Sequence, residues 1–381
     1  MQKLIAASAL ALILAGCGGG GADTGAASSL SSASGNPVSA PASNSKPSAA
    51  NDDASTASSR ALAARFNNPD GIAVDAQGNL FVADRRNFTI RQITPDGRVL
   101  TLAGRAGVAG SNDGAGSAAT FTNPRGIAID SGGNLYVTDM HAVRKVSPQG
   151  VVTTLAGAVA ASGDADGAGS AARFNFPHGL AVDGGGNVLV ADAENYLIRR
   201  IAPDGAVSTV AGSRGLRGRS DGPAGSASLI GPHGIDVASN GDIYFTDWLG
   251  PPAQNIPEGS ALLRKVSSQT GTVSTVLGNY RSDTGPALFS NAFALTVDAA
   301  DNIYLVNDEL TIHRITPSGQ HQQVGGPFAV AQPIGGITID RSGKLFITGS
   351  GTHTVASVDA SGSATLVAGK VNESGSVDVA Q

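Results

Sequence analysis

Residues 66–104 read FNNPDGIAVDAQGNLFVADRRNFTIRQITPDGRVLTLAG, and the chain copies this pattern again and again. Close copies begin at Phe121 (FTNPRGIAIDSGGNLYVTDMHAVRKVSPQGVVTTLAG) and Phe174 (FNFPHGLAVDGGGNVLVADAENYLIRRIAPDGAVSTVAG). Weaker copies begin at Leu229, Phe289 and Pro333, which gives six units in all. Each unit contains short β-rich runs separated by Asp-x-x-Gly-Asn and Pro-x-Gly turns, so the chain is built from short strands rather than helices.

This repeat predicts an all-β fold, a six-bladed β-propeller with four-stranded antiparallel blades. In the first unit the β-rich runs are residues 72–75, 80–83, 90–93 and 99–103. One sheet of four strands cannot bury both of its faces alone, but six such sheets around a common axis can shield one another. An open solenoid of six units is the alternative.

The segments between the units repeat as well, which favours a closed ring over an open stack. Residues 103–120 (AGRAGVAGSNDGAGSAAT) match residues 156–173 and, more loosely, residues 211–228. The end of the chain, AGKVNESGSVDVAQ, resembles the first part of this linker, and residues 61–66 resemble its last part. The termini therefore interrupt one linker of a circular pattern, although the linkers alone do not show whether an interleaved strand closes the ring.

Composition restricts the classes of partner. Charged residues make up 14% of the 381 residues, glycine occurs 52 times, and the formal net charge is −5. Abundant glycine with few charges favours short strands joined by turns. No basic run interleaved with aromatic residues occurs, so we expect no binding of nucleic acid, and we expect a monomer.

The first residues predict export. Lys3 precedes an apolar run from Leu4 to Leu14, which is too short to span a bilayer, since a spanning helix needs about 20 residues. The run ends in Leu-Ala-Gly-Cys17, which resembles the lipobox of bacterial lipoproteins. The resemblance implies that residues 1–17 form a lipoprotein signal peptide and that Cys17 is lipidated. Gly18 then favours the outer membrane in a Gram-negative cell; a plain signal peptide with an incidental cysteine is the alternative.

Residues 18–60 consist almost wholly of Gly, Ala, Ser, Asn, Pro and Thr. Such a segment cannot bury enough apolar surface to offset its ordering entropy, so it is predicted to be a disordered tether. The propeller is expected to occupy residues 61–381. The localisation predicted from these segments is the bacterial cell envelope, with a lipid anchor as the only contact with the membrane.

The units resemble NHL repeats, in which Pro-x-Gly-Ile-Ala-Val-Asp is followed by Gly-Asn-Leu-Tyr-Val-Ala-Asp and an Ile-x-x-Ile strand. The resemblance covers about 300 residues and implies a propeller, but it says little about activity. The second run ends in an aspartate in four units, and we expect these side chains to accept hydrogen bonds from loop amides: Asp84, Asp139, Asp192 and Asp247. Asn307 and Gly349 replace the aspartate in the last two units.

Strand order predicts which face binds. In an up-and-down meander, the start of the first strand and the end of the second lie on the same side, together with the long linkers. Sequence variation gathers there, including Trp248 and the insertion at residues 249–261 that follows it. Because binding residues are commonly presented by variable loops on a rigid scaffold, we place the ligand site on this face.

The residue before the glycine of the first strand differs from unit to unit. It is Asp70, Arg125, His178, His233, Phe293 and Gly335 in order. If the first strand is innermost, these side chains ring the mouth of the central channel. The predicted ligand-binding residues are therefore Asp70, Arg125, His178 and His233, with His141 and Trp248 as further contacts.

Metal binding and ligand binding without a metal both remain possible functions of these residues. His178 and His233 on neighbouring blades could bind zinc, and a Pro-His strand start resembles the zinc-binding positions of six-bladed peptidyl-hydroxyglycine lyases, but the third ligand is unassigned, with Asp70 as one option. Residues 164–167 (DADG) are similar to the start of a calcium loop without its glutamate. No cofactor is assigned. We expect a binding scaffold for a protein, peptide or glycan; the alternative is a metal-dependent lyase or hydrolase.

Overall fold

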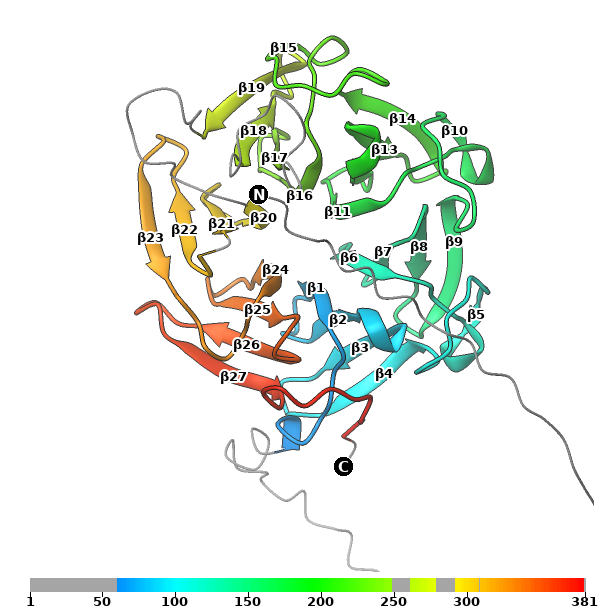
Figure 1. The fold of residues 1–381 in the computed structure, drawn as a ribbon, viewed down its shortest axis with the longest axis vertical. Helices are drawn as coiled ribbons and strands as arrows, with labels where there is room; N and C mark the ends of the chain where they lie inside the picture. The colour runs from blue at the N-terminus through cyan, green and yellow to red at the C-terminus, as the bar shows by residue number, and fades with distance from the viewer. Residues whose placement is uncertain (1–59, 249–260, 279–291, 308, 380–381) are drawn as a thin grey trace, which may run out of the picture. The chain divides into compact units, whose positions relative to one another are not determined.

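The computed structural model describes residues 60–248, 261–278, 292–307 and 309–379. They form six antiparallel sheets arranged as blades around a central axis (Figure 1). The predicted all-β, six-bladed propeller is confirmed. The predicted signal peptide, Cys17 and the tether lie outside the described residues, apart from Arg60 at the tether's end. In the part of the chain that is described, no helix is long and apolar enough to cross a membrane.

Within each blade the strands follow one another from the axis outward. Blades 1 to 3 contain β1 (Pro69–Val74), β2 (Leu80–Asp84), β3 (Thr89–Ile93), β4 (Val99–Gly104); β6 (Pro124–Ile129), β7 (Leu135–Asp139), β8 (Ala142–Val146), β9 (Val151–Gly157); β11 (Pro177–Val182), β12 (Val188–Asp192), β13 (Leu197–Ile201), β14 (Ala206–Ala211). Blades 4 to 6 contain β16 (Pro232–Val237), β17 (Ile243–Trp248), β18 (Ala261–Val266), β19 (Thr272–Leu277); β20 (Ala292–Val297), β21 (Ile303–Asn307), β22 (Ile312–Ile315), β23 (His321–Gly325); β24 (Ile334–Ile339), β25 (Leu345–Gly349), β26 (Thr354–Val358), β27 (Ala364–Gly369).

All six blades contain the four expected strands, and blades 2, 3 and 4 have a fifth, short strand in addition. In each, the preceding linker adds a two-residue strand to the outer edge: β5 (Gly114–Ala115) on β9, β10 (Gly167–Ala168) on β14, and β15 (Gly222–Pro223) on β19. An outer strand left alone exposes a row of unpaired backbone groups. The linker therefore covers part of an edge that the four-stranded repeat leaves open.

The hydrophobic core lies between the blades. One cluster joins Phe81 and Ile90 of blade 1 to Val137 of blade 2, and equivalent clusters follow at each further junction. A cluster containing Val82 and Phe346 joins blade 6 back to blade 1. Because the last junction is packed like the others, the ring is closed and the solenoid alternative is excluded.

Glycine at the start of the inner strand allows the inner strands to approach closely. A Cβ on Gly126 would lie 2.2 Å from the carbonyl oxygen of His178 in the next blade. A Cβ on Gly179 would lie 2.4 Å from that of His233. These separations are too short for a real side chain, so the Gly of each Pro-x-Gly motif is a requirement of ring geometry.

The C-terminal segment closes the ring, as the red segment beside blue blade 1 shows in Figure 1. Val379 pairs with Val99 on the outer strand of blade 1, and Val377 pairs with Arg65. Asp378 accepts hydrogen bonds from the amide and hydroxyl of Thr101. The C-terminal segment thus takes the place on blade 1 that a preceding linker takes in blades 2 to 4. The ring is therefore closed by an interleaved segment, which the linker pattern alone did not show.

A buried Asp–Arg–Asp network fastens blades 1 to 4. In blade 3, Arg199 donates from Nη1 to Asp192 at 2.8 Å and from Nη2 to the linker residue Asp166 at 2.8 Å. Asp192 also accepts from the amide of Asn175, which confirms the expected role of the strand-two aspartates. The side chains of Asp192 and Arg199 are both fully buried. The other networks are Asp84–Arg91–Asp378, Asp139–Arg144–Asp113 and Asp247–Arg264–Asp221.

Blades 5 and 6 lose both charges of the network together. In blade 5, Asn307 occupies the position of the aspartate and His313 that of the arginine. Asn307 Nδ2 and His313 Nε2 are 3.4 Å apart. In blade 6, Gly349 and Ala356 stand at these two positions. Loss of one partner alone would leave an unpaired buried charge, which costs far more than loss of both.

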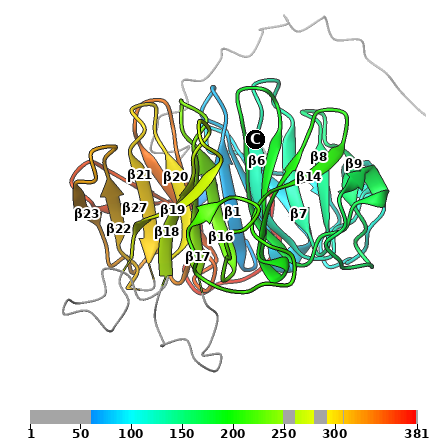
Figure 2. The same cartoon turned by 90° about the horizontal axis from the view of Figure 1, so that it is seen from above.

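The pairing register confirms the predicted arrangement of the two faces. Pro69 at the start of β1 pairs with Asp84 at the end of β2, and the same register recurs in blades 2, 3 and 4. The strands run between the two faces of the ring (Figure 2). We call the side with the linkers and the loops after the second strands the loop face, and the other side the turn face.

Removing one charge of the network is predicted to cost more than neutralising both. Arg199→Ala should lower the free energy of unfolding by about 3–5 kcal/mol, because Asp192 is left buried and unpaired. The pair Asp192→Asn with Arg199→His, which reproduces blade 5, should cost clearly less. Urea denaturation followed by circular dichroism measures both. A double variant as unstable as Arg199→Ala would contradict the role given to paired charge.

Candidate functional site

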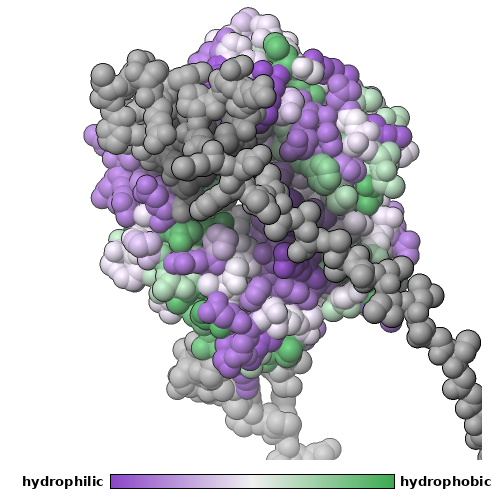
Figure 3. Space-filling model, in the orientation of Figure 1, coloured by the Kyte–Doolittle hydropathy of each residue, from purple (hydrophilic) through white to green (hydrophobic). Residues whose placement is uncertain are grey.

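Six residues converge at the loop-face end of the central channel. Each precedes the first-strand glycine of its unit, or the alanine at that position in blade 5. A cavity of about 290 Å³ is lined by all six inner strands and includes Asp70, Arg125, His178, His233, Phe293 and Gly335. In Figure 3, hydrophilic residues line the lower right side of the central hollow, where grey atoms do not cover it. We call this end of the cavity the mouth. The structure thus brings together four of the six predicted ligand-binding residues, Asp70, Arg125, His178 and His233.

Positive charge exceeds negative charge on the blade 1 and 2 side of the mouth. Arg85, in the turn η1 (Arg85–Asn87), lies 3.8 Å from the Asp70 carboxylate. The pKa of Asp70 is raised by burial, although Arg125 and Arg85 oppose the shift. The pKa of Arg125 is lowered by burial and then by the nearby Arg85, with Asp70 opposing. Arg85 is paired with the half-buried Asp70 carboxylate, and Arg125 interacts with the same carboxylate electrostatically.

His178 and His233 lie side by side as neutral imidazoles. Their ring centroids are 4.2 Å apart. Arg125 Nη1 lies 2.7 Å from Nε2 and 3.2 Å from Nδ1 of His178, so the guanidinium contacts both ring nitrogens of this imidazole. Burial lowers the pKa of His178 well below its usual value, helped by His233 and Arg125, and burial lowers the pKa of His233 to about 4. Both rings can accept a hydrogen bond near neutral pH.

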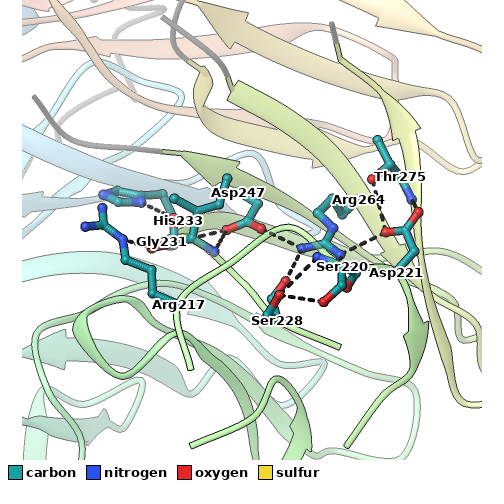
Figure 4. Close-up of polar contacts among 10 residues, drawn as sticks. Arg217, Ser220, Asp221, Ser228, Gly231, His233, Asp247, Arg264 and Thr275 are labelled. Atoms are coloured by element: carbon teal, nitrogen blue, oxygen red, sulfur yellow. Dashed lines mark hydrogen bonds and ion pairs between the residues drawn. The ribbon is translucent and has the colours of Figure 1, made fainter. Parts of the chain in front are cut away.

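In blade 4, the backbone of Gly231 connects the Asp–Arg–Asp network to the mouth residue His233 (Figure 4). Arg264 holds Asp247, and Asp247 accepts a hydrogen bond from the amide of Gly231 at 2.9 Å. The carbonyl of Gly231 lies 2.7 Å from His233 Nδ1 and accepts its proton. Nδ1 therefore carries the hydrogen, and Nε2 keeps a lone pair. The Asp–Arg–Asp network thus fixes the tautomer and orientation of a mouth residue.

An aromatic wall completes the side of blades 4 and 5. The half-buried Trp248 at the end of β17 contacts His233 edge to face, with 5.0 Å between ring centroids. It contacts Phe293, a lining residue of the cavity, at the same centroid distance. Trp248 therefore joins the predicted site. Residues 249–260 of the insertion that follows it lie outside the described residues.

His141 is not part of the mouth. Its Nδ1 accepts a hydrogen bond from the amide of Phe176 at 3.2 Å, and its ring packs on the Phe176 ring. His353 does the same for the amide of Asn68 at the junction of blades 6 and 1. The structure thus gives His141 a role in holding the entry of the next blade. Sequence comparison missed this equivalence because the loops after the second strands differ in length.

Asp236 is a channel residue that the sequence analysis missed. It lines the cavity on β16, where the other units carry Ala or Thr. Its carboxylate accepts hydrogen bonds from the amides of Val297 and Val237 at 2.8 Å each, and burial raises its pKa to about 6. The sequence does show this difference: unit four reads GIDVA where unit one reads GIAVD, so Asp and Ala have exchanged positions.

The predicted metal sites do not fit the residues present. A guanidinium already occupies the Nε2 side of His178, and a cation there repels a second cation. Among the described residues, no three His, Cys, Asp or Glu side chains are grouped to hold a metal. In the calcium-like segment, Asp166 is paired with Arg199 and Arg214 at 2.8 and 2.7 Å. Neither zinc at His178 and His233 nor calcium at Asp166 is supported by this geometry.

Comparison with known proteins identifies the repeat. The NHL repeat family matches residues 66–93 and 174–201, and the teneurin NHL domain family matches residues 108–163. The chain is 34% identical over 151 residues to NHL repeat-containing protein 2 of Bos taurus, a match that covers 36% of this chain and 21% of that protein. The chain thus spans about a fifth of the length of this curated relative.

Solved propellers share the fold at low identity. A gluconolactonase of Xanthomonas campestris is 17% identical with a TM-score of 0.52, over 75% of this chain and 84% of that chain. A streptogramin B lyase is 13% identical with a TM-score of 0.50, over 81% and 85%. Such identities establish the architecture and leave the chemistry open. The repeats, their matches and the closed ring together show that the chain is an NHL-repeat protein that folds as a six-bladed β-propeller.

Proposed function

We propose that this protein is an exported binding scaffold that holds a protein, peptide or glycan at the mouth. The observation that carries the proposal is the divergence of one repeat position. Six units that otherwise copy one another place an acid, a base, two imidazoles, an aromatic ring and a glycine around one cavity. Packing alone would not require six different residues at this repeat position, so their variety supports a role in binding a ligand.

The surroundings of the mouth also suit binding. Its side chains are held by neighbours: His233 by the Gly231 carbonyl, and Arg85 by Asn123, whose Oδ1 accepts from Nε at 2.7 Å. Preorganised polar groups lose little conformational entropy when a ligand arrives. The alternative, a metal-dependent lyase or hydrolase, receives less support because the guanidinium of Arg125 stands where a metal would have to bind His178.

Loss of the mouth chemistry is predicted to abolish capture of the partner. The tether and propeller, residues 18–381, would be immobilised and exposed to an extract of the cell envelope. The double variant Arg125→Gln, His233→Asn should lose the captured species, because it removes one cation and the acceptor of the mouth. Arg98→Gln on the turn face is the matched control and should retain it. Equal capture by both variants would place binding elsewhere.

Chelation separates binding from metal-dependent catalysis. Treatment of the purified protein with a zinc and calcium chelator should leave its melting temperature unchanged, because no described donor set fits either ion. Differential scanning calorimetry and metal analysis provide the measurement. Stoichiometric zinc that disappears in a His178→Ala, His233→Ala variant would instead support the enzyme.

We further propose that the chain is anchored to the cell envelope through lipid on Cys17, with residues 18–60 as a tether. The support is the short apolar run that ends in Leu-Ala-Gly-Cys. As a flexible coil, about 40 residues have an r.m.s. reach of roughly 35 Å, enough to hold the loop face clear of a membrane.

Cys17→Ser is predicted to release the protein from membranes. Cells grown with a labelled fatty acid should incorporate label into the parent chain and not into the variant. Fractionation should then move the variant from the membrane to the soluble fraction. A variant that stays lipidated and membrane-bound would refute the anchor and leave the propeller and its mouth unaffected.

A further inference from the structure

Among the described residues, the mouth holds two arginines and one acid, so positive charge is in excess there. Arg85 lies 3.8 Å from the Asp70 carboxylate, and Asp70 is also the acid that raises the pKa of Arg125 against the effects of burial and Arg85. The adjacent imidazoles of His178 and His233 are neutral, so they do not change the net charge of the mouth. The other acid of the cavity lining, Asp236, lies further along β16, away from the mouth. A guanidinium pair of this kind matches a carboxylate, which accepts two parallel N–H bonds.

The opposite side of the cavity offers different chemistry. His233 presents the lone pair of Nε2, because Nδ1 is bonded to the Gly231 carbonyl. Next to it, Phe293 lines the cavity and Trp248 packs edge to face against both His233 and Phe293. An acceptor for a hydroxyl and an apolar aromatic surface therefore face the guanidinium groups across a single small cavity.

The size of the cavity limits what can occupy it. Its volume of about 290 Å³ is at the lower end of ligand pockets, which hold roughly 300–1,000 Å³. The cavity extends along all six inner strands and is open, so one ring-sized unit fits inside it while the rest of a longer ligand stays outside. A uronic acid combines a carboxylate, hydroxyl donors and an apolar C–H face in one ring. A peptide supplies the same three groups from two side chains, or from one tyrosine together with the terminal carboxylate.

We propose that the mouth binds an acidic glycan through one uronic-acid residue. The carboxylate lies at Arg85 and Arg125, a ring hydroxyl donates to His233 Nε2, and the apolar face of the sugar packs on the aromatic wall. This inference rests on the proposed function and specifies its ligand. It predicts binding that weakens as salt rises, because charge attraction is screened.

Trp248 makes the test direct, since it is the only tryptophan of the chain and contacts the mouth residue His233. The full chain, purified in detergent, would be titrated with trigalacturonate while tryptophan emission is recorded. A saturable change is expected. The methyl-esterified trimer, which keeps the sugar ring and lacks the charge, should bind much more weakly, and a glutamate tripeptide should do the same.

Variants locate the contact. Arg125→Gln and, separately, Arg85→Gln should each weaken trigalacturonate binding by at least about 10-fold, because each removes a charge-assisted hydrogen bond. Arg98→Gln is the matched control: Arg98 pairs with Asp96 in the turn after β3, on the turn face, and its loss should leave binding unchanged. Melting temperatures close to that of the parent chain would show that both mouth variants fold.

The outcomes separate this inference from the proposed function. No saturable signal with trigalacturonate, or equal affinity for the ester, would overturn the uronic-acid proposal. Equal or tighter binding of the glutamate tripeptide would replace the glycan by an acidic peptide. If mouth variants still abolish capture from envelope extract while trigalacturonate fails, the binding function stands and only the ligand class is wrong.

Discussion

The buried Asp–Arg–Asp network is the interaction on which blades 1 to 4 depend. Each network joins the end of the second strand, the middle of the third strand and the linker that crosses the outer edge. The arginines are fully buried, and those of blades 1 to 3 also lie over the phenylalanine that opens the unit, at 5.0 Å for Arg91 and Phe66. A buried guanidinium with two carboxylates and an aromatic face has its charge compensated from several sides, and this makes the network a fastener.

The same network determines the geometry of the mouth. In blade 4 it holds the peptide unit that fixes His233, and in blade 2 Asp139 holds the amide of Asn123, whose side chain holds Arg85. Side chains of the proposed ligand site are thus one hydrogen-bonded residue away from side chains that stabilise the fold. This proximity gives the recognition residues fixed orientations without any rigid helix or disulfide nearby.

Repetition and divergence serve different purposes in this ring. Positions that pack between blades keep the same residue type, such as Phe66, Phe121 and Phe174, or the glycines at which inner strands meet. Positions that face the channel are free to differ, since they do not contact the next core cluster. The two blades that lack the network, 5 and 6, lose acid and base together, which is consistent with a cost for unpaired charge rather than with random decay.

The sequence alone determined the all-β class, the number of blades, the closed ring and the side on which variable residues gather. These follow from a short-range pattern of strands and turns repeated along the chain. It also placed Asp70, Arg125, His178 and His233 at equivalent positions. Only the tertiary structure decided the rest: the arginine partners of the aspartates, the C-terminal strand on blade 1, the place of His141 and the channel carboxylate Asp236. The Asp–Arg pairs inside a unit depend on the register between the second and third strands, as in Val82 with Arg91. The other features depend on contacts between residues far apart in the chain, such as Arg91 with Asp378, and spacing within one repeat carries no record of them.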